Sequence, residues 1–257
     1  MPTWDAELYL KFSSERTRPS VDLAARVAIP DPGRIIDLGC GPGNSTTVLG
    51  QRWPKAHITG LDNSSDMIAA ASRSYPQYEW IVGDISAWSA GIAFDVVFSN
   101  AALQWVPGHV SLIPHLFAQV APGGALAVQI PSHFNSCLHQ EILETADDPS
   151  WRHLMRPALN AMTKEPPSLY YNLLRPLAEQ LDMWETEYYH VVDSPQSIIE
   201  WFRGTSLRPY LAALEDEAQR QRFEEMLLER YTRAYLPQND GRILFLFRRL
   251  FIIAYRA

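Results

Sequence analysis

A glycine-rich turn between an apolar run and a helix-forming segment constrains the fold of this chain most. The stretch RIIDLGCGPGNSTTVL, residues 34–49, begins as a buried-strand pattern and then places Gly39, Gly41 and Gly43 within five positions. Turns of this kind connect a parallel strand to the following helix, and their bare backbone lets a ligand approach closely. The stretch therefore predicts an α/β sheet with a ligand site at the carboxyl end of this strand.

Strand-like and helix-like segments alternate on both sides of this turn. Short apolar strands joined by helical crossovers are typical of a parallel sheet whose two faces are covered by helices. The first five strands are expected at residues 34–39, 57–62, 79–85, 94–100 and 125–131.

The regular alternation of short strands and helices ends in the second half of the chain. A helix is expected over residues 133–146, a sixth strand over 183–192 and a long last strand over 242–256. Ser194-Pro195 is a helix start, with serine as the cap and proline at the first helical position. Residues 195–236 look helical throughout, with a break near Leu207-Arg208-Pro209.

Composition and charge exclude several classes of protein. With 47% hydrophobic and 20% charged residues, the 257-residue chain reads as a soluble globular protein, and no run of 18 apolar residues predicts a membrane span. The N-terminus lacks a signal-peptide pattern, and the two cysteines favour a reducing compartment, so a cytoplasmic location is expected. A net charge of −7 argues against a nucleic-acid partner. No metal-ligand motif is present, and the sequence leaves the oligomeric state open.

Two classes of ligand use a glycine turn of this type. Dinucleotide enzymes require a third glycine in G-x-G-x-x-G, but Asn44 stands at that position. An arginine beside the turn would suit a phosphate, but none occurs before Arg52. A nicotinamide oxidoreductase therefore stays as the weaker alternative.

The remaining class is the S-adenosylmethionine-dependent methyltransferases, and four positions resemble this family in order. Asp37 precedes the glycines, Asp62 ends the second strand, Asp84-Ile85 follow the third, and Asn100 ends the fourth. The resemblance implies that Asp62 accepts hydrogen bonds from the ribose hydroxyls, that Asp84-Ile85 lie beside the adenine and that Asn100 lies near the methionine part. Taken singly, Asp37 could cap the next helix and Asp62 could occupy a solvated turn.

The family resemblance implies a Rossmann-like methyltransferase fold: a mostly parallel seven-stranded sheet with helices on both faces, an antiparallel last strand and a helical cap. The resemblance also implies S-adenosylmethionine as the cofactor, with S-adenosylhomocysteine as its product. Trp105 could flank the sulfonium by a cation–π contact or could be a core residue. The predicted cofactor-binding residues are Asp37, Gly39, Gly41, Asp62, Asn63, Met67, Asp84, Ile85, Asn100 and Trp105.

The sequence after the fourth strand bears on the methyl acceptor. It reads NAALQW and lacks the Asp/Asn-Pro-Pro-Tyr motif of the methyltransferases that modify amino groups and bases, which leaves small-molecule acceptors. Methyl transfer from a sulfonium is an in-line displacement that depends mostly on holding the nucleophile in position. A carboxylate acceptor needs no general base because it is already ionised at pH 7, so no catalytic residue beyond positioning groups is predicted.

The whole chain is similar to the branch of trans-aconitate methyltransferases, which esterify one carboxylate of trans-aconitate. The most specific stretches are WDAELYLKFSSERTRP near the start, NAALQWVPGH after the fourth strand, and FRRLFIIAYR near the end. This resemblance implies trans-aconitate, a small anionic organic acid, as the substrate. Another small acid, another small-molecule acceptor, and a protein that binds the cofactor without catalysis remain as alternatives.

A tricarboxylate needs a local cationic pocket in a protein of net charge −7. From Trp201 onward the chain holds ten arginines, no lysine and seven acids, a balance of +3, so arginines of the last quarter are candidates. Each of these residues has a plainer alternative, such as an outward strand position for Arg249, helix capping for Arg18 or core packing for the tyrosines. The predicted substrate-binding residues are Arg18, Tyr9, Gln104, His133, Tyr171, Arg208 and Arg249.

The expected domain organisation has three parts. Residues 1–30 form an N-terminal helical lid, residues 31–192 and 241–257 form the methyltransferase core, and residues 193–240 form a helical insertion that caps the substrate. A lid that closes would exclude water and strengthen the arginine–carboxylate pairs.

Overall fold

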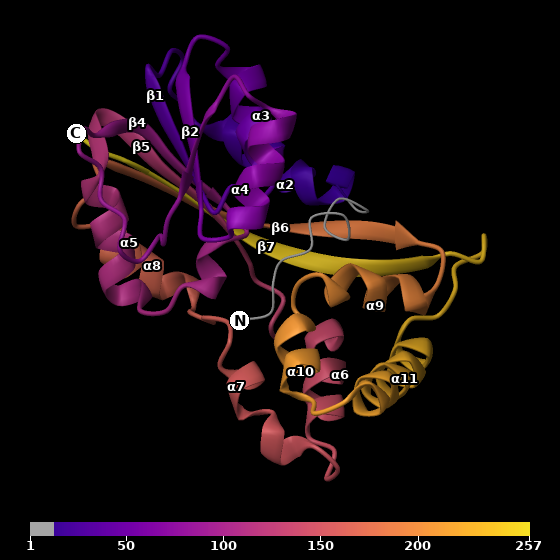
Figure 1. Ribbon diagram of the computed structural model, residues 1–257. Helices are drawn as coiled ribbons and strands as arrows, with labels where there is room; N and C mark the ends of the chain where they lie inside the picture. Colours follow the sequence, from indigo (N-terminus) through magenta and orange to yellow (C-terminus); the bar gives the residue numbers. More distant parts are fainter. Residues whose placement is uncertain (1–12) are drawn as a thin grey trace. The chain divides into compact units, whose positions relative to one another are not determined.

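The computed structural model describes residues 13–257 of the chain (Figure 1). The strands are β1 (Arg34–Leu38), β2 (His57–Asp62), β3 (Glu79–Val82), β4 (Phe94–Asn100), β5 (Val120–Pro131), β6 (Gln180–Val192) and β7 (Ile243–Tyr255). The helices are α2 (Ser13–Arg26), α3 (Asn44–Arg52), α4 (Ser65–Ser74), α5 (His109–Ala118), α6 (Cys137–Ala146), α7 (Arg156–Leu159), α8 (Pro167–Leu174), α9 (Pro195–Arg203), α10 (Arg208–Ala213) and α11 (Glu217–Ala234), with the short 3₁₀ turns η1 (Leu103–Trp105) and η2 (Arg152–Leu154).

The seven strands form one sheet in the order β3-β2-β1-β4-β5-β7-β6. Strands β1 to β5 pair in parallel, with Leu38 opposite Leu61 and Asp37 opposite Phe98. Strand β7 is antiparallel to β5, because the N–H of Gly123 donates to the carbonyl of Arg256 while residue 132 donates to residue 248. The predicted fold class is therefore confirmed.

The chain divides into two compact units. The first, here called the glycine-loop unit, takes the described residues up to Ile130 together with Thr163–Thr186 and Leu250–Ala257. The second, here called the α11 unit, takes Pro131–Met162 and Glu187–Arg249. The domain boundaries expected from the sequence stay predictions.

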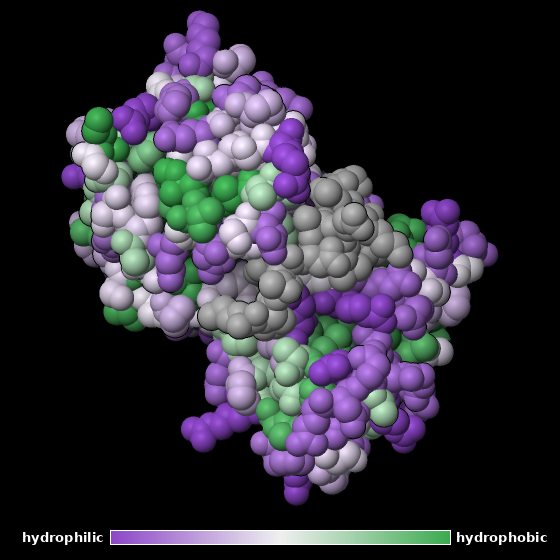
Figure 2. Space-filling model, viewed as in Figure 1, coloured by the Kyte–Doolittle hydropathy of each residue, from purple (hydrophilic) through white to green (hydrophobic). Residues whose placement is uncertain are grey.

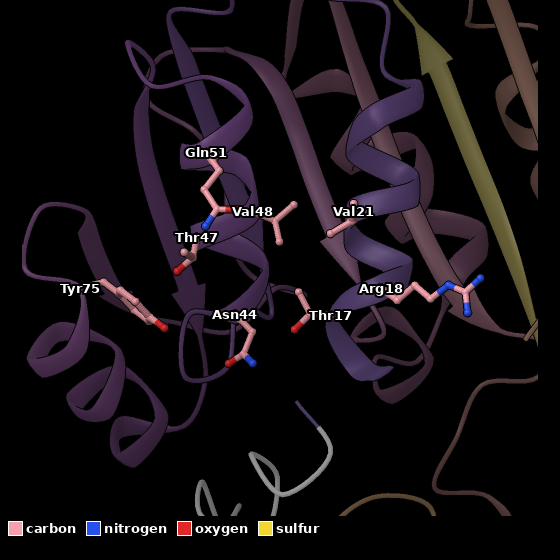
Figure 3. A pocket seen from close by; sticks show the side chains of 8 residues that line it. All are labelled: Thr17, Arg18, Val21, Asn44, Thr47, Val48, Gln51 and Tyr75. Carbon is pink, nitrogen blue, oxygen red and sulfur yellow. The ribbon is translucent and has the colours of Figure 1, made fainter. Parts of the chain in front are cut away.

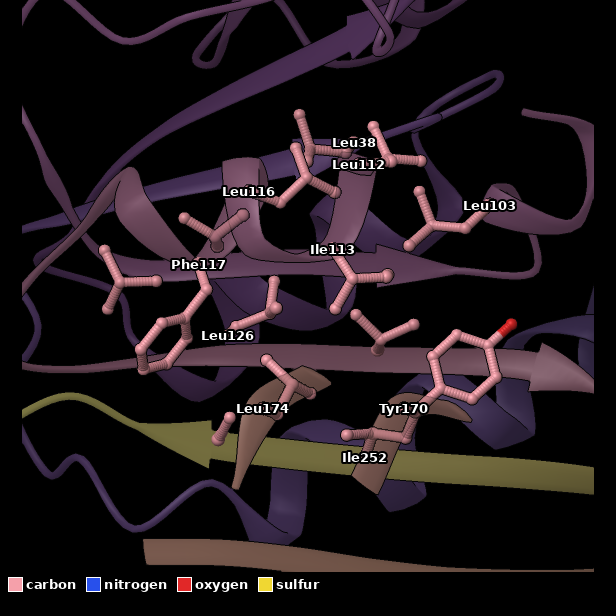
Figure 4. Close-up of a cluster of buried hydrophobic side chains, with 14 of the residues drawn as sticks. Leu38, Leu103, Leu112, Ile113, Leu116, Phe117, Leu126, Tyr170, Leu174 and Ile252 are labelled. Atoms are coloured by element: carbon pink, nitrogen blue, oxygen red, sulfur yellow. The ribbon is translucent and has the colours of Figure 1, made fainter. Parts of the chain in front are cut away.

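In the glycine-loop unit, helices cover both faces of the parallel strands. Figure 1 shows α3 and α4 on one side and α5 and α8 on the other. A buried cluster under α5 and α8 includes Leu116 and Leu174, which are at most 1% exposed, and Figure 4 shows Leu38, Leu103, Leu126 and Ile252 among its side chains. Burial of this aliphatic surface is the main force that holds the helices on the sheet.

The core of the α11 unit contains many aromatic side chains. Phe223, Leu227 and Tyr231 form the buried face of α11, and the Tyr231 hydroxyl donates to the Leu138 carbonyl on α6 at 3.0 Å. The surface around α11 is mostly hydrophilic in the view of Figure 2. No helix among residues 13–257 is long and apolar enough to cross a bilayer.

Side-chain caps fix several helix starts. Ser64 accepts from the N–H of Met67 at 3.3 Å at the start of α4, and Ser194 accepts from the N–H of Ser197 at the start of α9, as predicted. The stretch 195–236 is three helices and not two, because Asp216 begins a new helix by accepting from the N–H of Gln219 at 2.8 Å. Asp216 lies only two residues past Leu214, which is buried.

Some boundaries differ from those expected. Strand β3 ends at Val82 and not at residue 85, because Asp84 accepts from the Ser86 N–H and turns the chain. Strand β5 begins at Val120, which pairs with Phe94, so the Pro-Gly-Gly stretch lies inside the strand. Helix α6 begins at Cys137 and not at residue 133.

Candidate functional site

The glycine turn follows β1 and is held against the ends of two neighbouring strands. Gly39, Gly41 and Gly43 all have positive φ, a conformation that L-residues with side chains rarely adopt. A Cβ on Gly39 would lie 2.1 Å from the Cβ of Ala102, in the segment after β4. The sequence therefore needs glycine here for both the turn and the close approach of the β4 segment.

The backbone N–H groups of the turn are already used inside the protein. Gly39 and Cys40 both donate to the Leu61 carbonyl, at 2.7 and 3.1 Å. Gly41 donates to Oδ2 of Asp62 at 2.9 Å, and Gly43 donates to the Cys40 carbonyl at 3.1 Å. Since residue 42 is proline and has no N–H, residues 39–43 offer no amide to a phosphate.

Asp37 is a buried carboxylate directly below the turn. It is 0% exposed, and its Oδ2 accepts hydrogen bonds from the hydroxyls of Ser45 and Thr46, both at 2.6 Å. Burial raises the pKa of Asp37 to about 6, against the lowering effect of the two hydroxyls and with a further raising effect of Asp62. The sequence reasoning missed Ser45 and Thr46, although the Ser-Thr-Thr run after the glycines was visible.

Asp62 supplies a second carboxylate at the turn. Its Oδ1 accepts from the Ser64 N–H at 2.9 Å, while its Oδ2 holds Gly41. Burial raises the pKa of Asp62, and backbone N–H groups act in the opposite direction. Burial and the nearby carboxylates of Asp37 and Asp62 also raise the pKa of the Cys40 thiol, so this cysteine stays neutral and packs as a small side chain.

The ends of β3 and β4 complete the same edge of the sheet. Asp84 is exposed, and its Oδ1 accepts from the N–H and the hydroxyl of Ser86, both at 2.8 Å. Ile85 is buried and approaches Gly39, because its Cδ1 lies 3.6 Å from the position of a Cβ on that glycine. Asn100 ends β4, and the next residue, Ala101, has a positive φ of 55°. Such strain in a non-glycine residue is typical of functional segments.

The segment after Ala101 is fixed by a set of hydrogen bonds. The Gln104 amide donates to the Ala101 carbonyl at 2.7 Å, and His109 Nε2 donates to the Leu103 carbonyl at 2.8 Å. The Nδ1 of His109 then accepts from the Tyr170 hydroxyl at 2.7 Å, because a ring nitrogen facing a carbonyl must carry the proton. His109 and Tyr170 were not predicted from the sequence, since their contact joins residues 61 positions apart.

All ten predicted cofactor residues belong to the glycine-loop unit, and they lie at the carboxyl ends of β1 to β4 or in the segments that follow them, which is where parallel sheets bind ligands. Asn63 is exposed beside Asp62, whereas Met67 is buried under the start of α4. Trp105 is half-buried at the end of η1. Their part in binding stays a prediction.

A surface hollow of about 480 Å³ lies between α2 and α3, beside the end of the glycine turn at Asn44 (Figure 3). None of the ten predicted cofactor residues lines it, and Figure 3 shows the Arg18 side chain extending to the side of α2 away from α3. We therefore assign the site to the strand ends and not to the hollow. The residues lining it are Thr17, Arg18, Val21, Asn44, Thr47, Val48, Gln51 and Tyr75.

The predicted substrate-binding residues fall into both units. Gln104, Arg18 and Tyr171 belong to the glycine-loop unit. Gln104 is buried in the segment after β4, whereas Arg18 is exposed and Tyr171 is 51% exposed on α8. Tyr9 lies outside the described residues.

His133, Arg208 and Arg249 belong to the α11 unit. Arg249 is 4% exposed, with its guanidinium carbon 4.5 Å from the ring centre of Phe247, so it is not an outward strand residue. His133 is 2% exposed and lies 4.1 Å, centre to centre, from the same ring. Burial lowers the pKa of the half-buried Arg208.

Two further buried histidines, missed by the sequence reasoning, lie in the same aromatic cluster. His139 is 6.1 Å from His133, and His190 is 6.3 Å from Phe247, both measured between ring centres. His133, His190 and Arg249 therefore adjoin Phe247 inside the α11 unit, and His139 adjoins His133. Such a group of donors and a permanent cation in a low-dielectric environment favours an anion.

Comparisons with known proteins also indicate a methyltransferase. A family model described as "Methyltransferase domain" matches residues 35–124. A protein named trans-aconitate 2-methyltransferase from Rhodopseudomonas palustris (strain BisA53) is 44% identical over 255 residues, which cover 99% of each chain. A protein of the same name from Azoarcus sp. (strain BH72) is 44% identical over 261 residues, which cover 100% of each.

Solved structures of low sequence identity share the fold. The YcgJ protein from Bacillus subtilis superposes with a TM-score of 0.59 at 13% identity, covering 93% of this chain and 98% of that one. A protein described as a putative methyltransferase from Bacillus halodurans gives a TM-score of 0.60 at 13% identity, with the same coverage.

Proposed function

Because the chain belongs to the family of trans-aconitate 2-methyltransferases, we propose that it transfers a methyl group from S-adenosylmethionine to one carboxylate of trans-aconitate. The products are a monomethyl ester and S-adenosylhomocysteine. We also propose a cytoplasmic location, which is supported by the absence of a disulfide between the buried Cys40 and the exposed Cys137.

The observation that carries the proposal is the chemistry of the glycine turn. Its amides are used internally, and the carboxylates of Asp37 and Asp62 stand beside it. Such a site repels a pyrophosphate but suits a ligand that brings a positive charge and a ribose diol. S-adenosylmethionine supplies an activated methyl group on a sulfonium cation together with that diol.

Three polar residues in and beside the turn would each bind a different part of the cofactor. Asp62 accepts from the backbone N–H groups of Gly41 and Ser64, and a carboxylate with two oxygens has acceptor capacity left for ribose hydroxyls. The charge of Asp37 is buried, so it favours a cation bound above the turn. Asn100 ends β4 with its side-chain oxygen buried, in a position to accept from an ammonium group.

The chemical step needs positioning more than acid–base chemistry. A new O–CH₃ bond forms as the S–CH₃ bond breaks, the electron pair of that bond stays on sulfur, and no proton is transferred. Because the attacking carboxylate is already ionised, the protein must hold its oxygen in line with the breaking bond and exclude water. The fixed segment from Ala101 to Trp105 is suited to this task by its hydrogen bonds.

Binding of the acid is assigned to cationic and donor side chains. Arg249 and His133 in the buried aromatic cluster are proposed to bind carboxylates, and Arg208 and Arg18 are further candidates. The Gln104 side-chain oxygen is buried, and its amide donates to the Ala101 carbonyl. Gln104 therefore orients the segment after β4. Tyr171 is exposed and can donate its hydroxyl.

Mass spectrometry of the product tests the proposal. Trans-aconitate incubated with the protein and S-adenosylmethionine should gain the mass of one CH₂ group, and S-adenosylhomocysteine should form in equal amount. A panel of other small acids is the control for substrate range. If S-adenosylhomocysteine binds but no acid in the panel is methylated, a non-catalytic binding protein is the correct interpretation. If neither S-adenosylhomocysteine nor any acid in the panel binds, the proposal is wrong.

A further inference from the structure

The chain turns after β4 at a strained residue that lies close to the glycine turn. Ala101 has a φ of 55°, a backbone conformation that costs free energy in a residue with a side chain. Such a conformation persists only where the surrounding structure holds it in place. The Cβ of Ala102, the next residue, lies 2.1 Å from the position of a Cβ on Gly39. The position of this segment therefore sets the shape of the site beside the glycine turn.

Hydrogen bonds from distant parts of the chain hold the carbonyls of the segment after β4. The backbone N–H of Thr163 donates to the Gln104 carbonyl at 2.7 Å, and the Thr163 hydroxyl donates to the Val106 carbonyl at 2.8 Å. The Gln104 side-chain amide donates back to the Ala101 carbonyl at 2.7 Å. All four residues belong to the glycine-loop unit. The start and the end of η1 are therefore both held.

His109 on α5 holds the carbonyl that lies between these points. Its Nε2 donates to the Leu103 carbonyl at 2.8 Å, and the residue is 1% exposed. The hydroxyl of Tyr170 on α8, which is 0% exposed, donates to Nδ1 at 2.7 Å. Because Nδ1 accepts this hydrogen bond, the ring proton is kept on Nε2, which faces the carbonyl. A chain of two hydrogen bonds therefore runs from α8 through His109 to η1.

A second histidine on α5 makes the same type of bond at a different place. His115 Nε2 donates to the Trp88 carbonyl at 2.7 Å. Trp88 packs against Phe94, with 5.9 Å between ring centres, and Phe94 is the first residue of β4. His115 therefore supports the amino end of β4, whereas His109 acts at the carboxyl end, where ligands of parallel sheets bind.

We propose that His109 is a positioning residue for methyl transfer, which acts through the Leu103 carbonyl to hold the segment after β4. The inference rests on the proposed function and adds to it a residue that acts through the backbone. Since no proton moves in the reaction, the rate depends on how closely the acceptor oxygen is held in line with the sulfonium. Tyr170 keeps the ring in the form that donates to the segment.

Two substitutions separate the two hydrogen bonds of His109. In His109→Gln, the side-chain amide nitrogen reaches the place of Nε2 and keeps the bond to Leu103. In His109→Asn, the shorter side chain reaches only the place of Nδ1, beside Tyr170. We expect kcat for trans-aconitate to fall about 10- to 100-fold in His109→Asn and less than about threefold in His109→Gln. Tyr170→Phe, which removes the donor to Nδ1, should give an intermediate loss.

Three measurements separate positioning from a general loss of structure. Thermal unfolding should show similar destabilisation in the Gln and Asn variants of His109, because each loses one buried hydrogen bond. Affinity for S-adenosylhomocysteine should change less than about threefold, since the bonds of the glycine turn run to Leu61 and Asp62 and not to η1. His115→Asn is the matched control and should leave kcat within about twofold of the wild type. Equal kcat values in the two variants of His109, or an equal loss in His115→Asn, would overturn the inference.

Amide hydrogen exchange gives a readout that does not depend on turnover. Residues 101–106 should exchange faster in His109→Asn than in His109→Gln, because only the Asn variant loses the bond to the Leu103 carbonyl. The absence of a difference in this segment would overturn the inference. If the wild type methylates no acid, the proposed function fails, whereas faster exchange in His109→Asn still shows that His109 holds the segment.

Discussion

At the scale of single residues, Asp37 makes stability depend on pH in an unusual direction. Its pKa is about 6 in the folded protein against 3.8 for the exposed group, so the folded state binds this proton more tightly. Its contribution to the free energy of unfolding is therefore complete below pH 3.8 and is lost as the pH rises through 6. The loss amounts to about 3 kcal/mol, at about 1.4 kcal/mol for each pH unit between the two values.

Asp37→Asn should remove this dependence, because its side chain does not titrate. Urea unfolding of both proteins at pH 4 and pH 7.5 measures the effect. Relative to the variant, the wild type should lose about 2.5 kcal/mol between the two pH values, because the effect is not quite complete at pH 4. Any change in the hydrogen bonds from Ser45 and Thr46 shifts both measurements equally. Curves that stay parallel across this range would contradict the assignment of the raised pKa.

Gly39 is the residue whose replacement should disturb the turn most. Gly39→Ala combines a φ of +74° with a Cβ contact of 2.1 Å to Ala102. Gly123→Ala is the matched control, since its φ of +76° is the same but no atom lies within 4 Å of the added carbon. We expect the control to lose about 1 kcal/mol from strain and Gly39→Ala about 1–3 kcal/mol more. Thermal unfolding and S-adenosylhomocysteine titration check this, and equal losses would count against the close approach.

Arg249 and Arg248 are neighbours with opposite environments. Arg248 is exposed and paired with Glu187 at 2.6 Å, whereas Arg249 is buried over the ring of Phe247. Lysine cannot reproduce the planar stack and fork of a guanidinium, so Arg249→Lys should raise KM for trans-aconitate at least about tenfold. Arg248→Lys should change it by less than about twofold, because exposed pairs contribute little. Similar KM values in both variants would remove Arg249 from the substrate site.

At the scale of elements, an ion pair joins α6 to α11 in the second unit. Arg230 lies 3.3 Å from Glu141 and also contacts Glu144, with 30% of the Arg230 side chain and 20% of the Glu141 side chain exposed. Arg230→Met should cost about 1 kcal/mol, a value already reduced for this exposure, and high salt should shrink the difference. Arg233→Met, which breaks an exposed pair with Glu229, should cost less than about 0.5 kcal/mol. Urea unfolding of the two variants at low and high salt measures the free energy of unfolding that each one loses.

The sequence predicted the elements well where a pattern is local. Strands 57–62 and 94–100 have the expected bounds, since apolar runs between turn residues need no distant partner to be recognised. The start of α9 at Pro195 also follows from a local cap. The break at Asp216 had a local signal too, an acidic residue three positions before Gln219, but the helical pattern on both sides obscured it.

The candidate site was predictable only in part, for a physical reason. Carboxylates at strand ends are fixed by sheet topology, so their place at one edge follows from the order of strands. The contact of Thr163 with η1 and that of His109 with Tyr170 depend on tertiary packing. No periodicity in the sequence encodes either contact. The burial of Arg249 likewise depends on which face of β7 meets the aromatic cluster.

At the scale of the whole molecule, the predicted cofactor residues all lie in one of the two units. Binding of S-adenosylhomocysteine should therefore slow amide hydrogen exchange most in residues 37–45, 60–67 and 83–87 and in the segment after β4. The helices α6 and α11 belong to the other unit and should show a smaller change. Exchange measured by mass spectrometry with and without the ligand tests this. Protection of α11 equal to that of the glycine turn would show that the ligand site is not confined to the first unit.

The alternation along β7 limits how this protein can evolve. Consecutive arginines stand on opposite faces of the strand, one toward solvent and the next among aromatic rings. Insertion or deletion of one residue between 243 and 248 would move each of the two arginines to the opposite face of the strand. The number of arginines would not change. Length changes before β7 should therefore be confined to the turn at residues 237–241, where an added or lost residue need not shift the register of the strand.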